Sequence, residues 1–407
     1  MNYILILFVP VLFAAACGND EPKEYYNLET EMDEIGELLK EYDVVILGES
    51  THESEEFSKL FSELTLYLND NYNFNTYAME FGRDQFDFYL DYYESEGYTE
   101  NFPKEDFITT VHHNPEFDEV VQRAVDLDED FQLEGISRII AGPMHDNVTH
   151  EEFVADDLLD TSNMSEAFLD AEQGIKEQVQ SMAVEYGEID HEAMDELRTV
   201  YEDIHDSDYF NDLNTMSQNY IEARINFLKS TLSEDYLGDL EVENSREDYY
   251  ARRGQDMYEN IEALVEDDSK VIVHMHNAHA TKQLGEAGSH VEILDLMYNA
   301  LENSVGSRLE DSDINTFHIA TIFNEGENIF PDENFYREDT LPRKTRNNDL
   351  ENRISEYRLD HAFVNLHETD WADEELSTYY EGHPAWGGSM VPAEQYDGVI
   401  YIDYLEE

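Results

Sequence analysis

The chain has 407 residues, of which 41% are hydrophobic and 12% aromatic, so it is long enough to bury one large core or two modest ones. It carries 96 Asp plus Glu against 23 Lys plus Arg, which gives a formal net charge of −73. Because phosphate binding needs a basic stripe and none is present, the composition excludes a nucleic-acid-binding protein. The 27 Tyr and 21 Phe argue against an acidic disordered chain.

The acidic residues are spread through nearly every segment and are not collected in a tail. In high salt, mobile cations screen carboxylate repulsion, because the Debye length falls to about 3 Å at 1 M ionic strength. The charge therefore indicates a halophilic protein and does not identify a substrate. We expect its melting temperature to rise steeply with NaCl or KCl, and equal stability in dilute buffer would contradict this interpretation.

The first 17 residues read as a targeting segment. Residues 4–16 form a continuous apolar run of 13 residues, too short to span a bilayer as a stable helix. Three alanines then precede Cys17, which has no disulfide partner because it is the sole cysteine of the chain. This pattern resembles a lipobox, whose cysteine becomes lipid-modified and forms the new N-terminus. We expect an exported, membrane-anchored lipoprotein on the extracytoplasmic side, with residues 18–25 as a tether. An ordinary signal peptide with an incidental cysteine is the alternative.

Short strand patterns alternate with helical patterns along the rest of the chain. The strand patterns lie at residues 44–47, 76–79, 131–136, 271–273, 317–323, 362–364 and 399–402. Strands separated by helices predict an α/β fold with a mainly parallel sheet flanked by helices.

Residues from about 150 to 245 show a different pattern. Apolar residues repeat there every three to four positions, as from Met194 to Ile204, and no strand pattern interrupts them. We therefore predict one α/β domain over residues 26–407, with a helical insertion at about 150–245.

Acidic residues and histidines follow several of the predicted strands where each strand ends. They are Glu49 and His52 after residues 44–47, Glu80 after residues 76–79, and His276 and His279 after residues 271–273. In open α/β sheets, ligands bind at the carboxyl ends of the strands, so we expect these side chains to converge on one site.

A histidine beside carboxylates is suited to activating water. Imidazole titrates near neutral pH and can take a proton from water, while a carboxylate orients the ring and stabilises the imidazolium that forms. A single histidine at a strand end is more often a hydrogen-bonding residue of the core. We interpret His274 in this structural sense.

Three short motifs, in this order, resemble those of the erythromycin esterase family. They are Leu47-Gly48-Glu49-Ser50-Thr51-His52, Ala78-Met79-Glu80-Phe81-Gly82 and His276-Asn277-Ala278-His279. Arg253 resembles a residue of the helix that precedes the third motif. Each motif is weak by itself, but their ordered combination from about residue 43 to residue 403 is fairly specific. The resemblance implies a hydrolase that cleaves an ester or lactone, a function associated with antibiotic resistance.

The resemblance also implies a role for each residue at the strand ends. His52 would be the general base, with Glu49 and Glu80 placing it and the water. His276 would assist at the substrate carbonyl. The Gly-x-Ser-x-Gly motif of serine esterases does not occur in the sequence.

Arg253 and His279 would be supporting or substrate-binding residues by the same resemblance. Family members are regarded as cleaving the macrolide lactone without a metal, so no cofactor and no metal ligand is expected. The partner would be a small-molecule ester or lactone. Glu53, Phe61 and Ser137 stand where the family usually has Gly, a basic residue and an acid, so we expect altered substrate contacts.

Two alternatives remain open. The first is a metal-dependent hydrolase or peptidase of the same superfamily, although the spacing matches no standard zinc motif. Its ligands by residue type would be Glu49, His52, Glu80, His276 and His279. The second is a non-catalytic lipoprotein that binds a ligand or haem through the same histidines. Metal content and turnover of the purified protein distinguish these alternatives.

Overall fold

The computed structural model describes residues 23–50, 54–83, 90, 114–125, 130–137, 171, 173–175, 191–213, 215–230, 245–266, 270–283, 304–328, 339–340, 350–378 and 388–405. Its strands are β1 (Tyr25–Asn27), β2 (Val44–Glu49), β3 (Phe74–Gly82), β4 (Gln132–Ser137), β5 (Lys270–His276), β6 (Thr316–Asn328), β7 (Asp339–Thr340), β8 (His361–Asn365), β9 (Leu376–Thr378), β10 (Gly388–Met390) and β11 (Gly398–Leu405). Its helices are α1 (Met32–Leu39), α2 (Glu55–Tyr72), α5 (Pro115–Val125), α8 (His191–His205), α9 (Thr215–Ser230), α11 (Ser245–Glu266), α12 (Asn277–Ala280), α14 (Val305–Glu310), α15 (Leu350–Ser355) and α16 (Pro392–Gln395), with short 3-10 turns η2 (Phe210–Asp212) and η4 (Leu366–Glu368).

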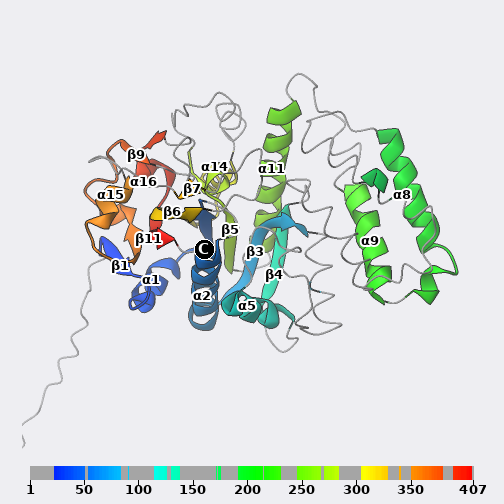
Figure 1. Cartoon of the computed structure of the whole chain (residues 1–407), viewed down its shortest axis with the longest axis horizontal. Helices are drawn as coiled ribbons and strands as arrows, with labels where there is room; N and C mark the ends of the chain where they lie inside the picture. Colours follow the sequence, from blue (N-terminus) through cyan, green and yellow to red (C-terminus); the bar gives the residue numbers. More distant parts are fainter. Residues whose placement is uncertain are drawn as a thin grey trace, which may run out of the picture.

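One large sheet organises the described part of the chain (Figure 1). Its strand order is β1-β8-β11-β6-β2-β5-β3-β4, with β7 paired to β6 outside this path, and β9 and β10 form a separate two-stranded sheet. The strands from β11 to β4 pair in parallel, whereas β8 and β1 are antiparallel additions at one edge. The predicted α/β fold with a mainly parallel sheet is therefore confirmed, and each predicted strand pattern lies in a strand apart from Phe131, which directly precedes β4. Strands β1, β7, β9 and β10 were not predicted.

Side chains of successive strand residues enter two different cores. Val45 and Leu47 of β2 pack with α1, α2 and α5 on one face of the sheet, which we call the α2 face. Val44 and Ile46 pack with α11, α14 and α15 on the other face, which we call the α11 face. Because strand side chains alternate and both faces of the sheet are covered, the sequence of β2 is a continuous apolar run over these residues.

Helices α8 and α9 lie in the region predicted as a helical insertion. They contact each other, and Figure 1 places the pair at the side of the molecule, away from the sheet (green). Both limits of the predicted insertion, residues 150 and 245, adjoin segments outside the described residues, so the domain boundaries stay a prediction. Residues 1–22, with Cys17, also lie outside the described residues. None of the described helices is long and apolar enough to cross a membrane.

A buried carboxylate, Asp397, joins segments that are far apart in the sequence. It accepts hydrogen bonds from Nζ of Lys282 at 2.6 Å and from the backbone N–H of His318 at 2.9 Å. Nε2 of His367 lies 3.0 Å from the same carboxylate. Burial by itself would raise the pKa of Asp397, but the hydrogen bond from His367 and the charge of Lys282 outweigh it and lower the pKa to about 2.

This low pKa predicts an acid-dependent contribution to stability. With an unfolded pKa near 3.9, ionised Asp397 should stabilise the fold by about 2 kcal/mol above pH 4, and the contribution should be lost as the pH falls toward 2. The measurement is urea denaturation of the wild type and of Asp397→Asn in constant molar salt. The difference between their free energies of unfolding should shrink as the pH falls from 4 to 2. A difference that stays constant down to pH 2 would show that Asp397 has an ordinary pKa.

Candidate active site

Three of the predicted site residues, Glu49, Glu80 and His276, lie at the carboxyl ends of three neighbouring strands. The chain passes from β2 to β3, and β5 later fills the place between them. Glu49, the last residue of β2, is the register partner of His276, the last residue of β5. Glu80 follows Met79, which pairs with β5 at His274. Such a reversal of strand order leaves a ligand-binding crevice at the carboxyl edge of an open sheet.

On the α11 face, Glu80 forms a buried cluster with the two predicted supporting residues. Arg253 of α11 donates from Nη2 to Oε1 of Glu80 at 2.5 Å and from Nη1 to Nε2 of His279 at 3.1 Å. A guanidinium can only donate, so Nε2 of His279 accepts and carries no proton. The other oxygen of Glu80 accepts the backbone N–H of His276 at 2.8 Å. The guanidinium of Arg253 thus compensates the buried charge of Glu80.

On the α2 face, Glu49 lies beside His274, for which the sequence predicts a structural role. Nε2 of His274 is 3.1 Å from Oε2 of Glu49, and the hydroxyl of Tyr77 is 2.9 Å from Nδ1 of His274. The ring of Phe61 meets the imidazole edge to face, with centroids 4.8 Å apart. Side chains alternate along β5, and Ile272, two residues before His274, packs on the α2 face. This alternation could have predicted that His274 lies on the same face as Glu49.

His276 ends β5 and caps α12. Its Nδ1 accepts the backbone N–H of Ala278 at 3.2 Å, and its side chain is partly exposed. A neutral His276 therefore carries its proton on Nε2. This nitrogen is then able to donate a hydrogen bond to a ligand.

Gly48 of the first motif and Asn277 of the third motif have structural roles. The Asn277 side chain donates to the backbone oxygen of Thr321 on β6 at 2.9 Å and accepts the backbone N–H of Thr321 at 3.3 Å. A Cβ atom on Gly48 would lie 2.5 Å from Oδ1 of Asn277. Glycine at residue 48 is therefore required for α12 to pack against β2 and for His276 and His279 to be held in place.

His52 and Glu53 lie in residues 51–53, outside the described residues. On either side of this segment, Ser50 is buried beside Glu49, and Ser54 accepts the backbone N–H of Phe57 at 3.3 Å as the N-cap of α2. The segment with His52 therefore joins the carboxyl end of β2 directly to the start of α2. Ser137, another departure from the family pattern, is buried at the end of β4.

No group of three His, Cys, Asp or Glu side chains in the described part of the chain is arranged to hold a metal ion. Glu80, one of the possible ligands, already accepts hydrogen bonds from Arg253 and from the backbone of His276.

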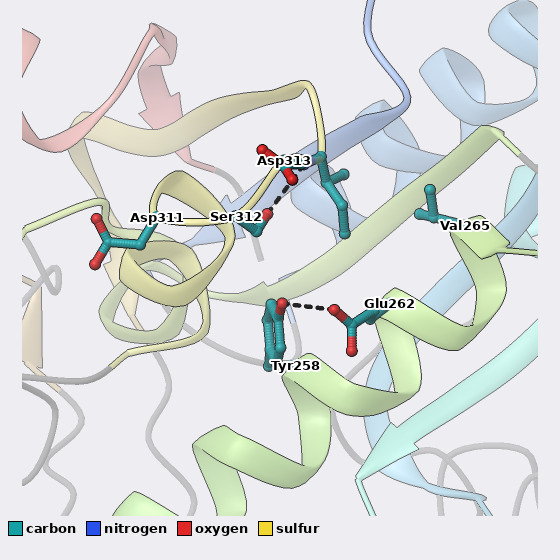
Figure 2. A pocket seen from close by; sticks show the side chains of 7 residues that line it. Tyr258, Glu262, Val265, Asp311, Ser312 and Asp313 are labelled. Carbon is teal, nitrogen blue, oxygen red and sulfur yellow. Dashed lines mark hydrogen bonds between the residues drawn. The ribbon is translucent and has the colours of Figure 1, made fainter.

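A cavity of about 420 Å³ lies elsewhere, at the opposite end of the sheet (Figure 2). Its walls come from the last turns of α11 and from the turn that precedes β6, so it adjoins the amino ends of β5 and β6. The lining side chains are Tyr258, Glu262, Val265, Asp311, Ser312, Asp313 and Ile314. Glu262 accepts a hydrogen bond from Tyr258 at 2.8 Å. The cavity is not part of the candidate active site.

Solved structures with the same fold are distant in sequence. A Bacillus cereus protein has a TM-score of 0.56 and 17% identity, with 93% of each chain covered. A succinoglycan biosynthesis protein has a TM-score of 0.59 and 16% identity, also with 93% of each chain covered. A mutant erythromycin esterase in its open conformation has a TM-score of 0.54 and 16% identity, covering 94% of this chain and 98% of its own. At these identities the likeness shows the fold alone.

No curated protein matches the sequence. The family described as erythromycin esterase matches residues 150–405, which include α11, β5 and the third motif. This match covers more than half of the chain. The protein therefore belongs to the erythromycin esterase family.

Proposed function

We propose that the protein is a hydrolase that cleaves an ester or lactone of a small molecule, with His52 activating the attacking water. The observation that carries this proposal is the convergence of Glu49, Glu80 and His276 at the carboxyl ends of β2, β3 and β5, next to the segment that holds His52. Family membership supports the hydrolase class.

In this proposal, neutral His52 takes a proton from water while the water oxygen attacks the ester carbonyl. The resulting imidazolium then gives its proton to the departing alkoxide oxygen. Glu49, adjoining the His52 segment, favours the imidazolium by its charge. Glu80 is held by Arg253 and by the backbone of His276, so its direction is preorganised.

His276, as the Nε2–H tautomer, could donate a hydrogen bond to the substrate carbonyl. Because its Nδ1 accepts the N–H of Ala278, neutral His276 carries its proton on Nε2, from which it would donate to the carbonyl oxygen as negative charge develops there. A donor held by a helix cap needs little reorganisation during the reaction.

A substrate panel tests the proposed function. Purified protein in molar salt is incubated with lactones, simple esters and peptides, with and without a chelator. We expect turnover of esters or lactones that the chelator leaves unchanged. Turnover abolished by the chelator would favour a metal-dependent hydrolase or peptidase. Ligand binding without any turnover would favour the non-catalytic alternative.

We further propose that the mature protein begins at Cys17 and is held by lipid on the extracytoplasmic side of the membrane. The small residues before the sole cysteine support this proposal. Mass spectrometry of the membrane fraction should show a diacylated or triacylated N-terminus, and Cys17→Ser should abolish the modification. A soluble protein cleaved at another residue and unaffected by Cys17→Ser would contradict it.

A further inference from the structure

Three buried polar side chains form a row beneath the carboxyl edge of the sheet, on the α2 face. Glu49, His274 and Tyr77 come from β2, β5 and β3, which are neighbours in that order. Their exposed fractions are 3%, 3% and 1%. Burying polar groups costs free energy unless they satisfy one another, so their contacts constrain where the protons lie.

The hydroxyl of Tyr77 determines the tautomer of His274. Burial raises the pKa of Tyr77 well above its usual value, with a further contribution from the charge of Glu49, so the hydroxyl keeps its proton. In the described part of the chain its hydrogen-bond partner is Nδ1 of His274, at 2.9 Å. The hydroxyl therefore donates and Nδ1 accepts. An imidazolium would leave the Tyr77 proton without an acceptor.

With Nδ1 as an acceptor, the neutral imidazole carries its proton on Nε2. This nitrogen is buried and lies 3.1 Å from Oε2 of Glu49, but the two atoms are not aligned as a hydrogen bond. Catalytic hydrogen bonds are often loose without substrate and tighten when it binds. The edge-to-face contact with Phe61 limits rotation of the ring.

We propose that His274 is a positioning residue for Glu49, and that Tyr77 sets the tautomer through which it acts. The Nε2–H of His274 directs the carboxylate of Glu49, which adjoins the segment with His52. This inference rests on the proposed function, because Glu49 acts there on His52. It assigns a role in the reaction to two side chains that do not touch the substrate.

The tautomer can be measured without any substrate. In the full-length protein labelled with ¹⁵N-histidine, the signal that disappears in His274→Gln belongs to His274. We expect the nitrogen shifts of the Nε2–H tautomer at neutral pH in the wild type, and a weakened preference for it in Tyr77→Phe. An Nδ1–H tautomer or an imidazolium in the wild type would overturn the inference.

Kinetics test the consequence for catalysis. Tyr77→Phe should lower kcat by about tenfold with little change in KM, as expected when one hydrogen bond that acts in the transition state is lost. Tyr401→Phe is the matched control: Tyr401 is fully buried and donates to Asp403 at 2.7 Å, on strand β11, which β6 separates from β2. It should keep the wild-type kcat even if its melting temperature falls as much as that of Tyr77→Phe.

Replacing His274 separates positioning from packing. The amide of His274→Gln can still donate toward Glu49, whereas His274→Leu cannot, so the Gln variant should keep more of kcat. An unchanged kcat in Tyr77→Phe, or equal kcat in the Gln and Leu variants, would overturn the inference. A wild type without esterase turnover would refute only the proposed function, and the tautomer measurement would then decide the inference.

Discussion

Replacing His52 by alanine or asparagine should lower the turnover of an ester or lactone by roughly 10²–10⁴-fold, the usual contribution of a general base. The variant should keep its fold, because residues 51–53 join β2 to α2 and both flanking elements have their own buried contacts. The wild-type rate should rise with pH through the apparent pKa of His52, since only the neutral imidazole accepts a proton.

The matched control is His205→Asn, compared with His52→Asn. His205 lies at the end of α8, with a side chain 41% exposed, and its contacts among the described residues are with Asp206, Phe210 and Glu222. We expect full turnover from this control. Full activity of His52→Ala on a genuine substrate would rule out the mechanism. A loss of activity in His52→Ala together with inhibition by a chelator would instead make His52 a metal ligand.

Replacing Arg253 by methionine should lower the free energy of unfolding by about 3–5 kcal/mol, the cost of breaking a buried ion pair by removing one partner. The side chains of Arg253 and Glu80 are 5% and 7% exposed, and their contact is 2.5 Å. Without the guanidinium, Glu80 would be a buried anion that has lost its cationic partner, and His279 would lose a donor. The measurement is urea denaturation at constant molar salt.

The control for this prediction is an exposed pair of the same type. Arg353 and Glu374 are 35% and 55% exposed and 3.0 Å apart. Arg353→Met should cost no more than about 1 kcal/mol, because solvent screens such pairs. Adding Glu80→Gln to Arg253→Met should restore part of the lost stability by removing the buried charge that Arg253 neutralised. An Arg253→Met cost equal to that of Arg353→Met would show that the buried pair contributes no more than an exposed one.

The strand patterns were predictable from the sequence because both faces of the sheet are covered. Residues 44–47 and 271–273 are apolar without interruption, and their side chains are buried on alternate faces. Strands β1, β7, β9 and β10 are only two or three residues long, too short to show a periodic pattern. β1 also pairs with β8, which lies far along the chain.

The sequence by itself determined that this protein has an α/β fold, and that acids and histidines lie where its strands end. Only the tertiary structure decided which side chain lies beside each acid. Glu49 and Glu80 lie on opposite faces of the sheet, so Glu49 meets His274 of β5, while Glu80 meets Arg253 of α11. The physical reason is that the order of the strands, and the alternation of side chains along each strand, set which side chains meet. A short sequence motif does not specify either of these.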